Sequence, residues 1–441
     1  MAKLPKPTKP LKILTIDGGG LQGISTLLIL HKLLNAIARN NGFPDSKPRP
    51  CDVFDVIAGI GPGGWLALLL GRFQMDVSAA LAEWYNLIDC IAPRSKAEEL
   101  RMRLMQHSYF DTDRLVEQID QLTEFYETDK HMFFTPPNGT RCKHVFVSAL
   151  KTDSKDTHLG YNLFRTYDCP EGSKVLDGPS DPRKYKLSHA FGVTGAAKYF
   201  TPPWKETSAK NGKSKFLDIQ FPSPHNITEL ALDEMWGIYG TDVEISVVVN
   251  IGPGIPNASD CRNIARRFSW GSKAATTSPA LPKRRKLSGA KEITTDPKRV
   301  PSHDYEPTDE MPHNGSEISP RVKFDQELPT LAGDTERKTP VARHTTFGSE
   351  QNVGIEEKLR RDENKIEVDI RRKLRNVYQK NTPPYYRLAP EKSAPGTAQN
   401  DTSSPKASFD ATMQYLHIRH VEVDIEEVSQ RVLLEIPVLA G

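Results

Sequence analysis

The chain has 441 residues, which is long enough for a large domain with additional segments. Its 59 Lys and Arg residues nearly balance its 56 Asp and Glu residues, so the overall charge of +3 does not favour a nucleic-acid-binding protein. Hydrophobic residues make up only 37% of the chain and 34 residues are proline, which predicts that part of the length does not fold.

The distribution of apolar residues and cysteines points to an intracellular protein. No apolar run approaches the 18 or so residues that a membrane-spanning helix needs, and the first residues lack the apolar core of a secretory signal. The cysteines are scattered without C-x-x-C spacing, which is typical of reduced thiols rather than of disulfides or a zinc site. They are Cys51, Cys90, Cys142, Cys169 and Cys261. We therefore expect a cytoplasmic location, no transmembrane segment and no metal.

From Leu11 to about Gly254 the pattern is that of an α/β fold. Short apolar runs rich in β-branched and aromatic residues predict strands, and the spacing of apolar residues predicts a helix over 24–37. The predicted strands cover residues 11–16, 52–58, 144–150, 161–167 and 243–251. Because strands alternate with helical stretches, we expect a mainly parallel central sheet covered on both faces.

The composition then changes twice, which predicts three parts: 9–265, 272–351 and 353–435. Residues 272–351 are dominated by polar residues and proline, and they offer too few apolar side chains to offset the entropy of ordering. We expect a disordered insertion there, which could recruit protein partners. Its basic run Lys283–Lys286 is consistent with nuclear localisation, an acidic partner or solvated linker charge. Helical periodicity returns over 355–374 and 421–432.

Two glycine-rich turns follow the first two predicted strands. The first, Asp17–Gly23, holds three consecutive glycines that can aim several backbone N–H groups into one concavity. The start of the following helix adds positive dipole character, so the turn suits a phosphate or the oxyanion of an acyl-transfer intermediate. The candidate oxyanion residues are Gly18, Gly19, Gly20, Gln22 and Gly23.

The second turn, Gly59–Gly64, has the strand, G-x-x-x-G turn and helix of a nucleophile elbow, G-x-S-x-G. Gly61 stands at its centre, where this chemistry needs a hydroxyl. Pro62 follows, and proline is favourable at the first position of a helix.

Both turns resemble the patatin-like phospholipase family, in particular its fungal members. The family pattern is DGGGxRG, GxSxG and a later DG[GA] aspartate that forms a Ser–Asp dyad. The sequence ILTIDGGGLQGIS matches the first motif with Gln22 in place of arginine, and FDVIAGIGPGGWLAL matches the second with Gly61 in place of serine. Asp218 corresponds best to the dyad aspartate, although Ile219 follows it where the family has glycine, and Asn226 is similar to a later family asparagine.

Further segments are similar to the family in the same order. NLFRTYD (162–168) resembles its FRSY strand, LSHAFGVTGAAKYFTPP (187–203) its ATSAAP segment, and VVVNIGPG (247–254) its SIGTG strand. Residues 386–388 and the last helices are similar to its C-terminal elements. The resemblance covers roughly 9–260 and 353–435 and implies a three-layer patatin-like sandwich with C-terminal helices packed on it.

This resemblance implies phospholipid or neutral-lipid acyl esters as ligands, peripheral contact with a membrane surface, and no cofactor. It also implies that the dyad is incomplete, because Gly61 leaves Asp218 no hydroxyl to activate. Loss of the serine in a related triad enzyme lowers kcat by about 10⁶. Pro62 has no N–H to offer an oxyanion. We therefore expect little or no hydrolase activity.

Several alternatives remain open. Ser25 is a possible substitute nucleophile in an active acyl hydrolase, although a serine in the first turn of a helix usually caps or packs. Gly18, Gly20 and Gly23 also satisfy the dinucleotide pattern G-x-G-x-x-G, but the second predicted strand ends without the required acidic residue. His189 and His225 lie near the later motifs, and Asp218 could be a turn aspartate. A non-enzymatic lipid-binding or scaffold protein is the remaining possibility.

Overall fold

The structure is a computed structural model. It describes residues 6–18, 22–42, 47–105, 110–137, 140–152, 158–179, 181–196, 204–208, 212–217, 226–254, 349–390 and 405–432. The predicted insertion lies outside these residues, except that its last three positions begin a helix at Ser349.

The described strands form one sheet in the order β5-β6-β3-β2-β1-β7-β8, with β4 also paired to β3. The strands β3, β2, β1, β7 and β8 are parallel neighbours, whereas β4 and β6 run antiparallel to β3 and β5 antiparallel to β6. Their bounds are β1 (Leu11–Ile16), β2 (Val56–Ile60), β3 (His144–Thr152), β4 (His158–Arg165), β5 (Trp204–Ser208), β6 (Gly212–Leu217), β7 (Ile245–Ile251) and β8 (Tyr385–Leu388). The mainly parallel sheet is confirmed.

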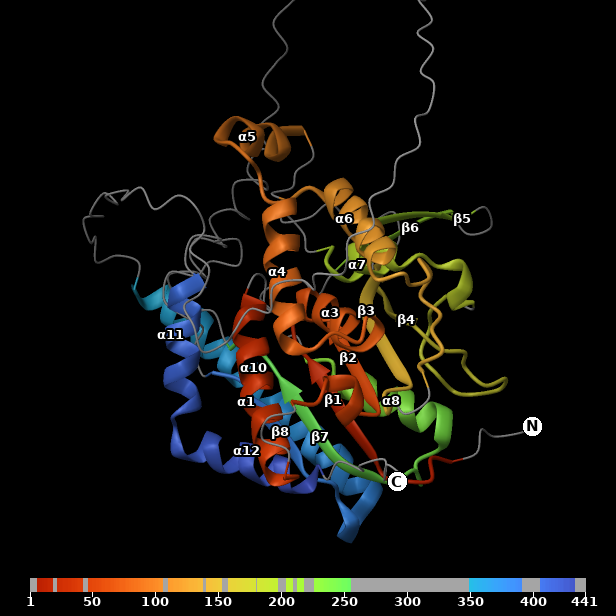
Figure 1. Ribbon diagram of the computed structural model, residues 1–441, viewed down its shortest axis with the longest axis vertical. Coiled ribbons are helices and arrows are strands. Elements are labelled where there is room, and N and C mark those ends of the chain that lie inside the picture. Colours follow the sequence, from red (N-terminus) through yellow and green to blue (C-terminus); the bar gives the residue numbers. More distant parts are fainter. Residues whose placement is uncertain are drawn as a thin grey trace, which may run out of the picture.

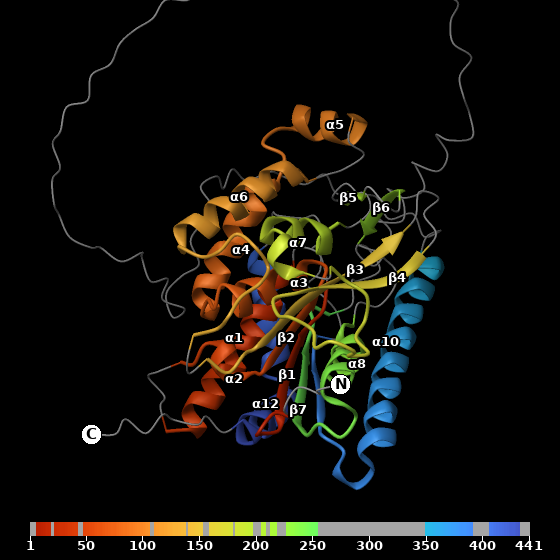
Figure 2. The same cartoon turned by 90° about the vertical axis from the view of Figure 1, so that its right-hand side faces the viewer.

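Helices cover both faces of the sheet. Their bounds are α1 (Gly23–Asn40), α2 (Pro50–Val53), α3 (Pro62–Ala67), the π-helical turn Leu68–Arg72, α4 (Val77–Ile91), α5 (Lys96–Met105), α6 (Thr112–Phe125), α7 (Leu187–Thr194), α8 (Thr228–Tyr239), α10 (Ser349–Tyr378), α11 (Pro405–Leu416) and α12 (Arg419–Arg431). Figure 2 shows α1 and α12 on one side of the sheet and α8 and α10 on the other. The predicted three-layer α/β sandwich is confirmed.

The alternation of side chains along the buried strands separates two hydrophobic cores. On β1, Leu14 and Ile16 belong to the core that also contains buried residues of α1, α3, α4, α6, α7, α11 and α12. Leu11 and Ile13 point to the opposite face and pack with α8 and α10. All four side chains are buried, as expected for a parallel strand covered on both faces.

The chain that follows the predicted insertion completes this body. β8 adds an edge strand parallel to β7, with Tyr385 opposite Val248 and Leu388 opposite Ile251. Ile370 and Leu374 of α10 enter the core beneath α8, and Val421 of α12 enters the core beside α1. In Figure 1 these blue elements lie against the red and green elements that precede the predicted insertion.

One predicted strand, 52–58, is wrong at its beginning. Residues Pro50–Val53 form the short helix α2, and the strand β2 starts only at Val56. Pro50 occupies the start of this helix, and Arg49 donates from Nε and from Nη2 to the carboxylate of Asp52, each at 2.8 Å. These local interactions favour a helical turn at residues 50–53 over the strand that the apolar pattern predicts. Residues 161–167 were predicted as a strand, and β4 covers 158–165 instead.

A buried histidine lies at the start of β3. Nε2 of His144 lies 3.1 Å from the hydroxyl of Tyr239, and its ring packs edge-on to the ring of Tyr167 with the centroids 4.7 Å apart. Burial lowers the pKa of His144 from its ordinary value of 6.5 to about 4.

This lowered pKa predicts acid sensitivity. Below pH 6.5 the unfolded chain binds a proton at His144 that the folded chain binds only near pH 4, so stability is lost as the pH falls through this range. Between pH 7 and pH 5 we expect the wild type to lose about 2 kcal/mol more than a His144→Gln variant, measured by urea unfolding. The exposed His420 supplies the control, and a His420→Gln variant that changes the pH dependence equally would contradict the assignment.

Candidate functional site

The first glycine turn, called here the glycine loop (Asp17–Gly23), joins β1 to α1. Asp17 and Gly18 are described, Gly19 and Gly20 lie outside the described residues, and the buried Gln22 stands at the N-cap of α1. A Cβ atom at Gly23 would lie 2.5 Å from the ring of Trp84. The last glycine of the loop therefore allows Trp84 of α4 to pack on the start of α1.

The second turn, called here the elbow (Gly59–Gly64), joins β2 to α3. Gly61 lies at its centre with φ 59° and ψ −140°, a conformation that strains any residue with a side chain. Pro62 begins α3, as predicted for a proline at the first helical position. The elbow thus keeps the sharp strand-to-helix turn of a nucleophile elbow around a residue that has no side chain.

The glycines that flank Gly61 are required by close backbone contacts. A Cβ atom at Gly59 would lie 2.3 Å from the carbonyl oxygen of Gly63. One at Gly63 would lie 2.3 Å from the carbonyl oxygen of Asp17 and 2.6 Å from that of Ile16. The elbow and the glycine loop therefore meet backbone to backbone at Asp17.

Helix α7 supports the elbow from the side. The hydroxyl of Thr194 donates to the carbonyl of Ser148 at 2.9 Å and lies 3.5 Å from the carbonyl oxygen of Gly61. The indole N–H of Trp65 donates to the carbonyl of Phe191 at 2.8 Å. These contacts fix the start of α3 against β3 and α7.

The predicted dyad aspartate Asp218 lies outside the described residues, as do Ile219 and His225. The strand β6 ends just before it at Leu217, which pairs with Leu150 of β3. Ile60 of the elbow pairs with Ser148 of the same strand, two positions earlier. Ile60 and Leu217, the residues before the two predicted dyad positions, therefore pair with neighbouring points of β3.

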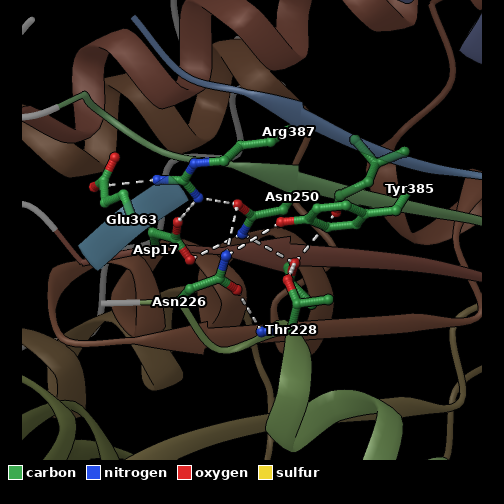
Figure 3. Close-up of polar contacts among 9 residues, drawn as sticks. Asp17, Asn226, Thr228, Asn250, Glu363, Tyr385 and Arg387 are labelled. Atoms are coloured by element: carbon green, nitrogen blue, oxygen red, sulfur yellow. Dashed lines mark hydrogen bonds and ion pairs between the residues drawn. The ribbon is translucent and has the colours of Figure 1, made fainter. Parts of the chain in front are cut away.

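A buried polar network holds the side chain of Asp17 (Figure 3). Asn250, at the end of β7, donates from Nδ2 to Oδ1 of Asp17 at 2.8 Å. Arg387 of β8 donates from Nη1 to Oδ2 of Asp17 at 2.5 Å and also donates to the amide oxygen of Asn250. Nη2 of Arg387 lies 3.3 Å from Oε1 of Glu363 on α10. The loop is thus tied to three elements of the C-terminal half.

The network continues to the start of α8. Asn226 accepts a hydrogen bond from the backbone N–H of Thr228 at 2.9 Å and donates to the hydroxyl of Tyr385 at 3.2 Å. The hydroxyls of Thr15 and Thr228 lie 2.8 Å apart. Asn226 therefore links the start of α8 to β7 and β8.

Burial and the neighbouring charges shift the pKa values of the ionisable groups in this network. Burial raises the pKa of Asp17 above its ordinary value, and the neighbouring charge of Arg387 opposes this effect. Burial also raises the pKa of Glu363, again against Arg387. Burial alone would lower the pKa of Arg387, but Asp17 and Glu363 outweigh it and raise that pKa. The guanidinium therefore stays charged and holds the buried carboxyl group of Asp17 and the half-buried one of Glu363 together.

Two alternative candidates have structural partners. Ser25 is buried on α1, and its hydroxyl lies 2.8 Å from the hydroxyl of Thr412 on α11, which donates its own proton to the carbonyl of Ser408. His189 is half-buried, with its ring 5.9 Å from that of Tyr185, and burial lowers its pKa. Within the described ranges, no group of His, Cys, Asp and Glu residues is arranged to hold a metal ion.

Sequence reasoning missed Arg387, Glu363 and Thr194. An arginine inside the apolar run YYRL and an asparagine inside VVVNI are the available signals, because a polar residue in a buried strand needs a partner. Asn250 and Arg387 lie 233 and 370 positions from Asp17, and only the fold brings them together.

Comparison with known proteins agrees with these motifs. Residues 14–176 match the family model described as patatin-like phospholipase. Over this stretch the chain is similar to patatin-like phospholipases. Proteins of this family act on lipid esters, and no helix in the described part of this chain is long and apolar enough to cross a membrane.

The similarity to individual patatin-like proteins is local. Patatin-like phospholipase 1 of Plasmodium falciparum is 38% identical over 80 residues, which are 18% of this chain and 11% of that protein. Phospholipase A I of Arabidopsis thaliana is 40% identical over 81 residues, 18% of this chain and 6% of that protein. The crystal structure of VipD from Legionella pneumophila matches with a TM-score of 0.27 and 12% identity, covering 60% of this chain and 55% of VipD.

The backbone contact between the two turns predicts that a substitution of Gly63 strongly lowers the stability of the protein. In a Gly63→Ala variant the added methyl group would press on two backbone carbonyls that cannot move aside, so we expect a loss of roughly 3 kcal/mol in the free energy of unfolding. Urea unfolding measures the change. The neighbouring Pro62→Ala variant is the control and should change stability by less than about 1 kcal/mol. Equal stabilities of Gly63→Ala and wild type would contradict the contact.

Proposed function

We propose that this protein is a patatin-like lipid-binding protein with little or no acyl hydrolase activity. The observation that supports it is Gly61, which occupies the sharp turn between β2 and α3 with no side chain. The acyl ester of a phospholipid or neutral lipid would lie between the elbow and the glycine loop, as the family resemblance implies. The N–H groups of Gly18–Gly20 would face its carbonyl oxygen.

The missing hydroxyl removes the covalent step. In a Ser–Asp hydrolase the serine oxygen attacks the ester carbonyl as its proton passes to the aspartate. The ester C–O bond of the tetrahedral intermediate then breaks, the alcohol leaves with that proton, and an acyl-enzyme remains. With Gly61 no acyl-enzyme forms at this position, and loss of a comparable serine lowers kcat by about 10⁶. The hydroxyl of Thr194, near the carbonyl of Gly61, already donates to the carbonyl of Ser148.

The environment of Ser25 favours the inactive form over a hydrolase with a substitute nucleophile. Its oxygen is buried and bonded to Thr412, whose hydroxyl also lies 2.6 Å from the carbonyl of Ser408. A nucleophile needs a neighbouring base within hydrogen-bond reach, and the bonds described at Ser25 run to another hydroxyl. This arrangement is typical of packing between α1 and α11.

Restoring the hydroxyl tests this proposal. A Gly61→Ser variant places a hydroxyl on the elbow, so we expect measurable hydrolysis of a short-chain acyl ester and covalent labelling by a fluorophosphonate. The same substitution forces a side chain into a positive-φ conformation, so it should lower stability by about 1–3 kcal/mol.

Gly61→Ala is the matched control, because it carries the same backbone strain without the hydroxyl. It should lose stability equally and remain unlabelled. Wild-type protein that reacts with the probe, or that hydrolyses the ester as fast as Gly61→Ser, would contradict the proposal and indicate an active enzyme with another nucleophile.

A further inference from the structure

Asp17 lies at the contact between the glycine loop and the elbow. Its backbone N–H donates to the carbonyl of Ile251 at 2.9 Å, which joins it to the end of β7. Its carbonyl oxygen packs on Gly63 so closely that a Cβ atom there would be 2.3 Å away. A displacement of Asp17 would therefore change how the loop and the elbow face each other.

The side chain of Asp17 is buried and fully engaged, since Oδ1 accepts from Asn250 and Oδ2 accepts from Arg387. Arg387 belongs to β8, 370 positions further along the chain. The flat guanidinium contacts Asp17, Asn250 and Glu363 together, which fixes its own orientation as well as theirs. Through these contacts, a shift of β8 or α10 would also shift Asp17 at the start of the loop.

We propose that Arg387, held in place by Glu363, is a positioning residue for Asp17, and that the C-terminal segment thereby fixes where the glycine loop leaves the sheet beside the elbow. Arg387 acts through Asp17 and need not touch a ligand. This inference rests on the proposed function for its catalytic consequence, but its structural part can be tested without any activity.

A second buried ion pair allows a matched comparison. Arg165 of β4 donates from Nε to Oε1 of Glu234 at 2.5 Å, and Glu234 also accepts from the hydroxyl of Tyr167. Both arginines are largely buried and paired with buried carboxylates. Arg165 contacts α8, however, and none of its described bonds reaches the glycine loop.

Hydrogen–deuterium exchange of the full-length protein tests the positioning role. Arg387→Lys keeps the charge, so that the chain folds, but it removes the planar fork that contacts three partners at once. We expect faster exchange, by about tenfold, in the peptide that contains Asp17–Gly23. Arg165→Lys should weaken the protein to a similar extent in urea unfolding and leave exchange of this peptide unchanged. Equal exchange in the two variants would overturn the proposal.

Kinetics in the Gly61→Ser background add the catalytic consequence. Misplaced loop N–H groups should lower kcat by roughly 10-fold to 100-fold in Gly61→Ser/Arg387→Lys with little change of KM, because the loop acts on the transition state. Gly61→Ser/Arg165→Lys should keep the kcat of Gly61→Ser. Equal kcat values in these two double variants would also overturn the positioning role.

The exchange experiment and the kinetic experiment can fail independently of each other. If Gly61→Ser itself is inactive, the proposed function loses its support while the exchange experiment still decides the role of Arg387. Faster loop exchange in Arg387→Lys then supports positioning without a hydrolase site, and unchanged exchange rejects it.

Discussion

The structure depends on the backbone contact between two turns at the carboxyl edge of a parallel sheet. Strands β1 and β2 are neighbours, so the glycine loop and the elbow that follow them leave the sheet side by side. Gly63 can approach the carbonyls of Ile16 and Asp17 only because it has no Cβ atom. This contact fixes Asp17, the first residue of the glycine loop, against the start of α3.

The local part of this arrangement could be predicted from the sequence, whereas the long-range part could not. Glycines at 59 and 63, the proline at 62 and the apolar run over 11–16 act within a few residues, and their consequences for the turn and the strand follow from backbone sterics. The sequence also shows directly that position 61 carries no hydroxyl, because its residue is glycine. The strand predicted over 52–58 failed because Arg49 and Asp52 stabilise a helical turn that apolar periodicity does not reveal.

The partners of Asp17 illustrate what local patterns leave out. Asn250, Glu363 and Arg387 come from two strands and a helix, and two of the three follow the long polar segment. Nothing in the spacing of these residues relates them to the glycine loop. The family match ends at residue 176, so the segment that anchors the loop lies beyond the most recognisable part of the chain. The parallel pairing of β8 with β7 is the step that brings Arg387 to Asp17.

A glycine at the centre of the elbow is compatible with the sharp turn for a physical reason. A serine at the centre of an elbow occupies a backbone conformation that costs about 1–3 kcal/mol, and an active enzyme bears this strain because the exposed hydroxyl is useful. Glycine adopts the same conformation freely, so replacing serine at this position removes the strain without disturbing the turn. The contacts of Gly59 and Gly63 are unaffected, because they involve backbone atoms alone. Gly61 therefore strains the fold less than a serine would, while the backbone contacts that shape the turn are kept, which is the general direction of the exchange between stability and activity.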